Sequence, residues 1–295
     1  MSIFLTGSTG FVGKNIISYL NSRFSISKYT RGTEIIINED IVIHLAGKAH
    51  DLKNVSAELD YYNANTEFTK QVFDQFLISN AKVFITLSSV KAAADELNIE
   101  LTETHTPNPI THYGKSKQLA EQYILSKEIP LDKRVFILRP CMIHGKGNKG
   151  NLNLLYKMVS KGFPWPLGNF ENKRSFCSID NLCFIINELI ENDQIPSGIY
   201  NIADEDPVST NELISMIARS QSKKPHIWKI PKSLIYTIAK VGDVFGLPLN
   251  TERLYKLTEN YVVSNKKIRD AINKSMPFSA EDGLIKTINS FQNNV

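Results

Sequence analysis

The first residues of the chain carry the pattern that most constrains its fold, an apolar run that leads directly into closely spaced glycines. Residues 3–5 are apolar, Gly7, Gly10 and Gly13 follow, and apolar side chains recur at helical spacing over residues 12–20. A strand, a glycine turn and a helix in this order let the backbone approach a pyrophosphate, whose charge the amino end of the helix stabilises. The spacing is Gly-x-x-Gly-x-x-Gly and not the commoner Gly-x-Gly-x-x-Gly, so by itself the pattern fits a phosphate site and a plain tight turn alike.

Strand-like and helix-like segments alternate up to about residue 140. The expected strands are Ser2–Thr6, Ser27–Thr30, Ile35–Ile37, Ile41–Leu45, Val83–Leu87 and Val135–Leu138, and the expected helices are Phe11–Ser22, Tyr61–Ile78 and Thr111–Ser126. This alternation predicts an α/β fold with a parallel sheet covered on both faces. Only three residues separate Ile37 from Ile41, too few for a crossover helix, so we expect one strand-helix-strand unit to be shortened there.

A second pattern, Tyr113-x-x-x-Lys117, places a phenol and an ammonium on one face of a helix, about one turn apart. A cation beside a phenol lowers the pKa of the phenol, which favours a proton donor or acceptor that works near neutral pH. Ser89 follows the apolar run 83–87, where its hydroxyl can share a substrate oxygen with Tyr113. Tyrosine and lysine often lie four apart on solvated helices, and the pair gains weight from the glycine-rich N-terminus.

Taken together, these features resemble the extended short-chain dehydrogenase/reductases, specifically the branch of sugar-nucleotide epimerases and dehydratases. The resemblance covers nearly the whole chain, and its further segments are His44-Leu45-Ala46-Gly47, Asn65-Thr66-Glu67-Phe68-Thr69, Leu138-Arg139-Pro140 through Gly145, Arg174-Ser175-Phe176 with Asp180-Asn181, and Tyr200-Asn201-Ile202. It implies a doubly wound parallel-sheet Rossmann fold with a smaller, mainly helical C-terminal substrate domain. The expected dinucleotide-binding domain is 1–145 with a returning segment at about 175–203, and the nucleotide-sugar domain is 146–174 with 204–295.

The resemblance also implies roles for particular residues. Tyr113 is expected to be the general acid/base, Lys117 to bind the nicotinamide ribose, and Ser89 to hold the reacting oxygen. The expected cofactor-binding residues are Gly7, Thr9, Gly10, Phe11, Val12, Gly13, Arg31, Leu45, Ala46, Gly47, Asn65, Tyr113 and Lys117. The expected substrate-binding residues are Ser89, Lys91, Asn151, Leu152, Arg174 and Arg253. His44 is expected to pack at the sheet edge, and no metal site is expected.

Arg174 is the main candidate for the substrate diphosphate, because a guanidinium forks onto phosphate oxygens in a way that lysine does not. The backbone at Asn151 and Leu152 is expected to contact the diphosphate or the base, and Arg253 is a weaker second phosphate ligand.

The end of the second strand bears on the choice of cofactor. An acid about 20 residues after the glycine loop would bind the ribose 2′-hydroxyl of NAD. Here residues 29–32 read Tyr-Thr-Arg-Gly, with no acid before Glu34. Since Arg31 would attract a 2′-phosphate, we expect NADP(H), with NAD(H) as the alternative.

The residues after Ser89 narrow the reaction. Dehydratases of the family carry an Asp-Glu pair there, whereas this chain has Val90 and Lys91. A 4-keto reductase and a 4-epimerase remain, and the loops 146–151 and 164–168 are similar to those of bacterial surface-polysaccharide enzymes that reduce a UDP-4-keto-6-deoxy-N-acetylhexosamine. The expected function is that reduction, with UDP-sugar 4-epimerase as the runner-up and a non-catalytic NADP-sensing regulator as a distant third.

Composition sets the remaining expectations. The chain has 295 residues, 42% of them hydrophobic, a net charge of +4 and three cysteines. It shows no apolar run of about 18 residues, no signal peptide and no concentrated basic stripe, so we expect a cytoplasmic enzyme without membrane insertion or nucleic-acid binding. Relatives often dimerise through the two helices that correspond to 61–78 and 111–126, which makes a homodimer one expectation.

Overall fold

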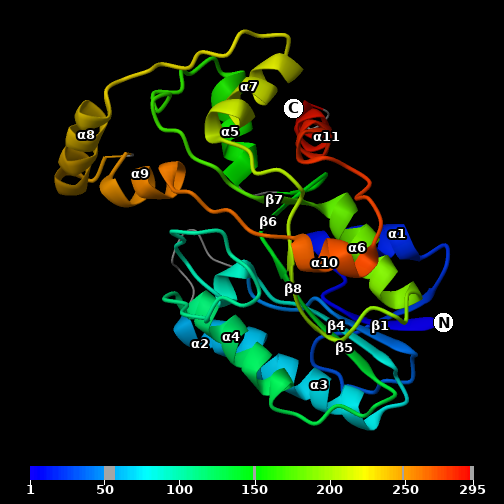
Figure 1. Ribbon diagram of the computed structural model, residues 1–295. Helices are drawn as coiled ribbons and strands as arrows, with labels where there is room; N and C mark the ends of the chain where they lie inside the picture. Colours follow the sequence, from blue (N-terminus) through cyan, green and yellow to red (C-terminus); the bar gives the residue numbers. More distant parts are fainter. Residues whose placement is uncertain (50–56, 149–150, 248, 293–295) are drawn as a thin grey trace.

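The computed structural model describes residues 1–49, 57–148, 151–247 and 249–292, with the backbone alone at residue 151. It consists of a parallel sheet with helices on both faces and, beside the carboxyl end of that sheet, a smaller group of helices (Figure 1).

The main sheet has six parallel strands in the order β2-β1-β3-β4-β5-β8. Their bounds are β1 Ser2–Thr6, β2 Ser25–Lys28, β3 Ile41–His44, β4 Val83–Leu87, β5 Arg134–Pro140 and β8 Gly198–Ile202. Successive side chains of a strand point to opposite faces, so that Ile3 and Leu5 enter one core cluster and Phe4 enters another. The predicted α/β doubly wound Rossmann fold is thereby confirmed.

Different helices cover the two faces. The cluster that holds Ile3 and Leu5 also takes side chains from α1 (Phe11–Leu20), α6 (Ile179–Glu191) and α10 (Lys266–Ile272). The cluster that holds Phe4 takes side chains from α3 (Phe68–Ile78) and α4 (His112–Leu125). The three predicted helices in this half of the chain are present, and the one predicted at 61–78 is divided into α2 (Glu58–Tyr61), the π-helical η1 (Tyr62–Glu67) and α3.

The segment between β2 and β3 differs from the sequence-based expectation. The prediction of a strand at Ile35–Ile37 is wrong, because these residues form no regular element and β2 pairs only with β1. The chain crosses from β2 over β1 to β3 without a helix, as the short spacing predicted. Ile37 is 8% exposed in the core beside Phe4, whereas Ile36 is 58% exposed. The irregular crossover thus covers the sheet face where a helix would otherwise lie.

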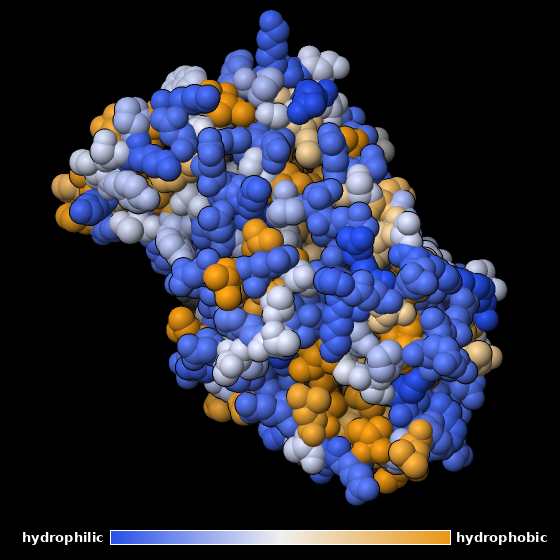
Figure 2. Space-filling view, in the orientation of Figure 1, coloured by the Kyte–Doolittle hydropathy of each residue, from blue (hydrophilic) through white to orange (hydrophobic). Residues whose placement is uncertain are grey.

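A third core cluster lies in the C-terminal part of the chain. It packs side chains from α5 (Asn151–Ser160), α7 (Thr210–Ser220), α8 (Lys232–Phe245), α9 (Thr251–Thr258) and α11 (Ala280–Gln292) against a small parallel sheet of β6 (Met142–His144) and β7 (Phe176–Ser178). Helices α8 and α9 project at the left of Figure 1, and Figure 2 shows hydrophobic side chains at the tip of that projection. The domain boundaries given above remain a prediction.

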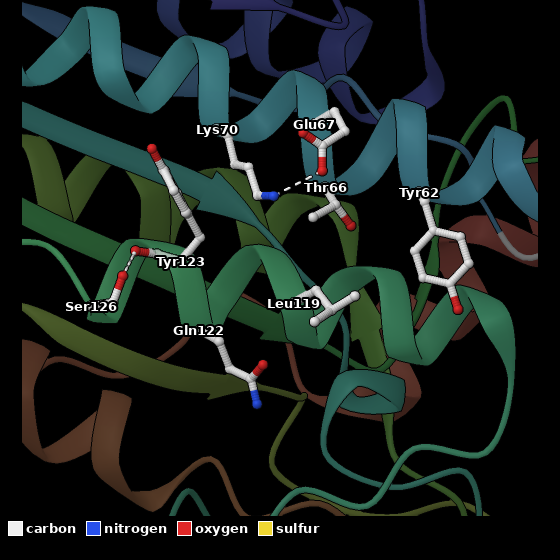
Figure 3. Close-up of a pocket in the computed structure, with 8 residues that line it drawn as sticks. All are labelled: Tyr62, Thr66, Glu67, Lys70, Leu119, Gln122, Tyr123 and Ser126. Carbon is white, nitrogen blue, oxygen red and sulfur yellow. Dashed lines mark hydrogen bonds and ion pairs between the residues drawn. The ribbon is translucent and has the colours of Figure 1, made fainter.

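A shallow groove lies on the outer side of the helices that would form the predicted dimer interface. It runs between η1, α3 and α4, and Figure 3 shows its lining residues Tyr62, Thr66, Glu67, Lys70, Leu119, Gln122, Tyr123 and Ser126. None of the candidate site residues lines it, so it is separate from the chemistry considered below. Among the helices that the structure describes, none has the length and apolar character required to cross a bilayer.

The crossover packing predicts a difference between two adjacent isoleucines. Ile37→Ala should lower the free energy of unfolding by about 2–4 kcal/mol, because it removes buried methyl groups and leaves a cavity against the sheet. Ile36→Ala, at the exposed neighbouring position, should change it by less than about 0.5 kcal/mol. Urea unfolding of both variants measures the difference, and equal effects would show that the crossover does not pack on the sheet as described.

Candidate active site at the carboxyl end of the sheet

The candidate residues gather where three neighbouring strands end. The last residues of β1 and β3, Thr6 and His44, are register partners, and His44 is in turn the partner of Thr86 in β4. The glycine loop, the segment 45–47 and the serines after β4 therefore leave the sheet at one level. This edge is where open α/β sheets bind their ligands.

The glycine loop folds as the sequence predicts. Gly7 has a φ of +73°, and a Cβ on it would lie 2.7 Å from the backbone nitrogen of Ala46. A Cβ on Gly13 would lie 2.2 Å from the Gly7 carbonyl oxygen, so both glycines permit close backbone contacts. Helix α1 starts after Gly10 with no side-chain cap and no acid in its first turn. Its first N–H groups are therefore available to a phosphate.

Gly47, Asn65 and Lys117 meet in the space next to this loop. A Cβ on Gly47 would lie 2.7 Å from Asn65 Oδ1 and 3.1 Å from Lys117 Nζ. The Asn65 side chain is fully buried; its Oδ1 accepts from the Lys48 backbone N–H at 2.8 Å, and its Nδ2 donates to Ser116 Oγ at 3.0 Å. Asn65 lies in the π-helical turn η1, a distortion that is frequent at functional sites. Asn65 thus joins the 45–48 segment to α4.

A close approach of two segments brings Ser89 to Tyr113. Helix α4 begins at His112, and a Cβ on Gly114 would lie 2.4 Å from the carbonyl oxygen of Lys91. Only glycine lets the start of α4 lie this near the short helix η2 (Val90–Ala92), which Ser89 caps. In this position the half-buried Tyr113 and the buried Ser89 form a side-chain hydrogen bond. The structure therefore unites the two hydroxyls that the sequence placed 24 residues apart.

The protonation of Tyr113 differs from the sequence-based expectation. Burial raises the pKa of Tyr113, and the hydrogen bond with Ser89 opposes that rise. The expected lowering of the Tyr113 pKa by Lys117 is therefore not found, and the pKa is raised mainly because the phenolate loses its hydration. Lys117 Nζ donates to the Leu87 carbonyl at 2.9 Å, and burial lowers the pKa of Lys117 to about 8. In this arrangement Tyr113 is a neutral phenol at neutral pH.

A buried ion pair supports this part of the site from below. Arg139 and Glu121 are 2% and 3% exposed, and the Arg139 Nε donates to Glu121 Oε1 at 3.0 Å. The Ser88 hydroxyl donates to the same carboxylate, which also raises the pKa of Lys117 against the effect of burial. Ser88 therefore anchors the end of β4 to α4 and leaves Ser89 as the hydroxyl that faces Tyr113.

Arg31 lies just after the carboxyl end of the edge strand β2, in a turn where the Thr33 N–H donates to Thr30. It is exposed and makes no ion pair within the described part of the chain. Because β2 pairs with β1, Arg31 is at the same edge of the sheet as the glycine loop.

Of the predicted substrate residues, Ser89 and Lys91 follow β4, whereas Arg174 lies across this edge, on the C-terminal part of the chain. Arg174 donates to the Lys256 carbonyl at 2.7 Å and to Glu259 Oε1 at 3.3 Å. Lys91 Nζ lies 4.2 Å from the ring centroid of Tyr261, and both Glu259 and Arg174 act electrostatically on Lys91. Lys91, Arg174, Glu259 and Tyr261 thus form one charged cluster between the two parts of the molecule.

The other predicted substrate residues, Arg253, Leu152 and Asn151, belong to helices α9 and α5. Arg253 is exposed on α9, the helix whose last turn Arg174 contacts. Leu152 is buried in the C-terminal core, in the first turn of α5, so only its backbone can contact a ligand. The side chain of Asn151, which begins α5, lies outside the described residues, as do residues 149 and 150 of the predicted substrate loop.

Sequence reasoning missed several residues of this region. Tyr61 packs against Tyr113 with ring centroids 6.2 Å apart, and Glu121, Glu259 and Tyr261 were not singled out. Their partners are 18 to 167 residues away along the chain. The four-residue spacing of Glu121 from Lys117, on the same helix face as Tyr113, is the one local signal that was present.

Three histidines receive partners that the sequence did not reveal. His44 is fully buried between the hydroxyls of Thr6 and Thr69, at 2.8 and 2.9 Å, and burial lowers its pKa to about 3. The two others are His112, which contacts Glu58 and Tyr62, and His144, which contacts Asp204 and Thr287. His44 therefore packs at the sheet edge, as predicted.

The environment of His44 predicts a specific acid sensitivity. The unfolded chain binds a proton at His44 below its usual pKa of 6.5, whereas the folded chain does so only near pH 3, so this residue makes stability fall as the pH drops through that window. As the pH is lowered from 6 to 4, the free energy of unfolding should fall less steeply in His44→Gln than in the parent. The two slopes should differ by up to about 1.4 kcal/mol per pH unit. The exposed His226→Gln is the control. Parallel pH profiles of the parent and His44→Gln would contradict the assignment.

Comparisons with known proteins give the context of this site. A family model described as NAD dependent epimerase/dehydratase family matches residues 3–203. The UDP-glucose 4-epimerase of Vibrio cholerae is 28% identical over 320 residues, which cover 98% of this chain and 95% of that protein. The N-acetyl-alpha-D-glucosaminyl-diphospho-ditrans,octacis-undecaprenol 4-epimerase of Escherichia coli O157:H7 is 27% identical over 293 residues, covering 91% and 84%.

Solved structures show the same fold over the whole chain. MoeE5 in complex with UDP-glucuronic acid and NAD matches with a TM-score of 0.76 at 17% identity, covering 100% of both chains. RMD from Pseudomonas aeruginosa complexed with NADPH matches with a TM-score of 0.73 at 19% identity, covering 100% and 99%. The family match runs from β1 through the Ser89, Tyr113 and Lys117 segment to the end of β8. The chain is therefore an enzyme of the NAD-dependent epimerase/dehydratase family.

Proposed function

We propose that this enzyme reduces the 4-keto group of a nucleotide-diphosphate sugar, specifically a UDP-4-keto-6-deoxy-N-acetylhexosamine used for surface polysaccharide. The observation that carries the proposal is the Ser89–Tyr113 hydrogen bond at the end of β4, beside a buried Lys117. A carbonyl oxygen between the two hydroxyls would receive a hydrogen bond from each. The raised pKa of Tyr113 keeps its proton available for an alkoxide that forms there.

The residues at the sheet edge fit a nicotinamide dinucleotide. The uncapped start of α1 and the Gly7–Gly13 turn suit the pyrophosphate, and the glycine at position 47 lets Lys117 Nζ, the proposed ribose contact, lie close to the backbone at this edge. When bound, the reduced cofactor supplies the hydride that the carbonyl carbon gains. Arg31, exposed beside the same edge, supports NADPH as the preferred form, since its charge complements a 2′-phosphate. NADH stays as the alternative.

Arg174 is the proposed contact for the sugar diphosphate. It lies across the sheet edge from Ser89 and is held by the Lys256 carbonyl and Glu259. Lys91 adds a second cation to that cluster. The two cations would offset the charge of a diphosphate and, with Glu259, set how the sugar enters. Since a diphosphate links the sugar to its carrier both in UDP-sugars and in the undecaprenol-linked substrate named for the Escherichia coli relative, this contact would suit either carrier.

The runner-up is a UDP-sugar 4-epimerase, which the names of the two curated relatives favour. An epimerase must first take a proton from the substrate hydroxyl, so it needs Tyr113 as a base. The neutral Tyr113 and the exposed Arg31 favour the reductase instead, because reduction needs a proton donor and an exchangeable NADPH. Where a dehydratase carries a carboxylate, this chain has Lys91. The residue therefore does not support the elimination that a dehydratase catalyses.

Turnover distinguishes the two functions. The absorbance of NADPH should fall stoichiometrically when a UDP-4-keto-6-deoxy-N-acetylhexosamine is added. Tyr113→Phe should slow this by about two to four decades, because it removes the proton donor. The opposite result would contradict the reductase and support the epimerase. That result is interconversion of UDP-N-acetylglucosamine and its 4-epimer without added cofactor, together with no oxidation of NADPH by the keto sugar.

The two arginines predict opposite binding defects. Arg31→Ala should weaken NADPH binding by about 1.5–3 kcal/mol, the value of a charge-assisted hydrogen bond, and should leave UDP binding unchanged. Arg174→Leu should weaken UDP binding by a similar amount, about 1.5–3 kcal/mol, and leave NADPH binding unchanged. Calorimetric titration of both ligands into both variants makes each variant the control for the other. A parent that binds NADH more tightly than NADPH would refute the role of Arg31, and unchanged UDP binding in Arg174→Leu would refute that of Arg174.

A further inference from the structure

Helix α8 carries an exposed apolar stripe that the proposed function does not use. Leu234, Ile238, Val241 and Phe245 are 51%, 41%, 43% and 74% exposed. Their spacing of four, three and four residues places them within about 60° of one another around an α-helix. Isolated exposed leucines are ordinary on protein surfaces, but a continuous row along one helix marks an interaction site.

The packing of α8 onto its own chain uses a different face. Ile235, Ala239 and Gly242 are the buried residues of the helix, and a Cβ on Gly242 would lie 1.9 Å from the Leu249 carbonyl oxygen. The helix is therefore already fixed against the segment that leads to α9. In Figure 1 it is the outermost element of the projecting lobe, and Figure 2 shows hydrophobic side chains at the same tip. The exposed stripe is thus presented outward and does not support the fold.

The charge of the surrounding segment indicates what kind of surface the stripe meets. Residues 221–258, from the end of α7 to the end of α9, contain seven lysines and arginines and two acids, a net charge of +5. The whole chain carries +4, so the remainder carries −1. The positive excess of the protein is thus concentrated in the stretch of sequence that contains the apolar stripe. An apolar face with a basic surround is the combination that binds at the interface of an anionic membrane.

We propose that α8 docks the enzyme onto an anionic phospholipid surface, with the stripe of Leu234, Ile238, Val241 and Phe245 at the level of the acyl boundary. The helix has 14 residues, about 21 Å, and is too short to cross a hydrocarbon core of about 30 Å, so it would lie in the plane of the interface. Lys232 and Lys240 lie on its other side, where headgroups and water meet a helix in that orientation. A second copy of the chain is a poorer occupant, because a symmetric contact through this lobe would bring two segments of +5 together.

Sedimentation with vesicles tests the docking without any use of the active site. The parent should sediment with vesicles of equal parts phosphatidylglycerol and phosphatidylcholine, much less with phosphatidylcholine alone, and less as salt is raised. Replacing the four stripe residues by glutamine should lower the bound fraction by about tenfold or more, because apolar area and charge act together in such binding. A control variant, Ile78→Gln with Leu125→Gln and Leu131→Gln, removes apolar side chains of similar or greater exposure elsewhere and should bind like the parent.

Two measurements keep the outcomes separate. Circular dichroism melting should be the same for the stripe variant and the parent, since the substituted residues are exposed. NADPH oxidation by the soluble keto sugar should also be unchanged, so vesicle binding without any turnover would count against the proposed function and leave the docking supported. Failure of the parent to bind the anionic vesicles, or equal binding by parent and stripe variant, would overturn the proposal. The proposal would also be overturned if the parent ran as a dimer and the stripe variant as a monomer in size-exclusion chromatography, while neither protein bound vesicles.

Discussion

The site depends on the parallel register of three strands. Thr6, His44 and Thr86 lie side by side at the carboxyl ends of β1, β3 and β4, so the loops that follow these strands start at the same level. The hydroxyl of Thr6 accepts from the Ala46 N–H at 3.1 Å and contacts His44, which fixes the second of these loops against the first. Because a shift of one residue would turn these side chains to the other face of the sheet, the buried hydrogen bonds of His44 hold the register as well as the loops.

Burial then decides which groups around this edge carry charge. His44 has no charge at neutral pH, the pKa of Lys117 falls to about 8, and that of Tyr113 rises, in each case mainly because the charged form loses its hydration. The buried Arg139–Glu121 pair is the exception, since each charge compensates the other at hydrogen-bond distance. Removing one partner from such a pair would leave an unpaired buried charge, which makes this pair a structural requirement beneath Ser88 and Lys117.

The segment 259–263 connects the two parts of the molecule over the site. Tyr261 donates its N–H to the Lys173 carbonyl and its hydroxyl to the Ala94 carbonyl, and the Leu101 N–H donates to Val262. This segment thus lies between the loop after η2 and the strand-like run at Arg174. The charged cluster of Lys91, Arg174, Glu259 and Tyr261 is a consequence, because its members come from both sides of that connection. We propose that substrate selectivity is set here, at the contact of the two parts.

Local sequence patterns were enough to predict the strand-glycine-helix start, the exact bounds of β1 and β4, and the helix that carries both Tyr113 and Lys117. These are local properties, since apolar periodicity and the backbone freedom of glycine depend on neighbours in the chain. The sequence also showed that one strand-helix-strand unit is shortened before Ile41, though not that Ile35–Ile37 forms no strand. A run of β-branched residues looks the same whether it pairs in a sheet or packs irregularly over one. The folded structure was needed to show that Gly114 meets the Lys91 carbonyl, that Glu259 pairs with Arg174, and that burial raises the pKa of Tyr113. Each of these results depends on burial and on contacts between segments that are distant in the chain. Burial and such contacts do not follow from the spacing of residues along the sequence.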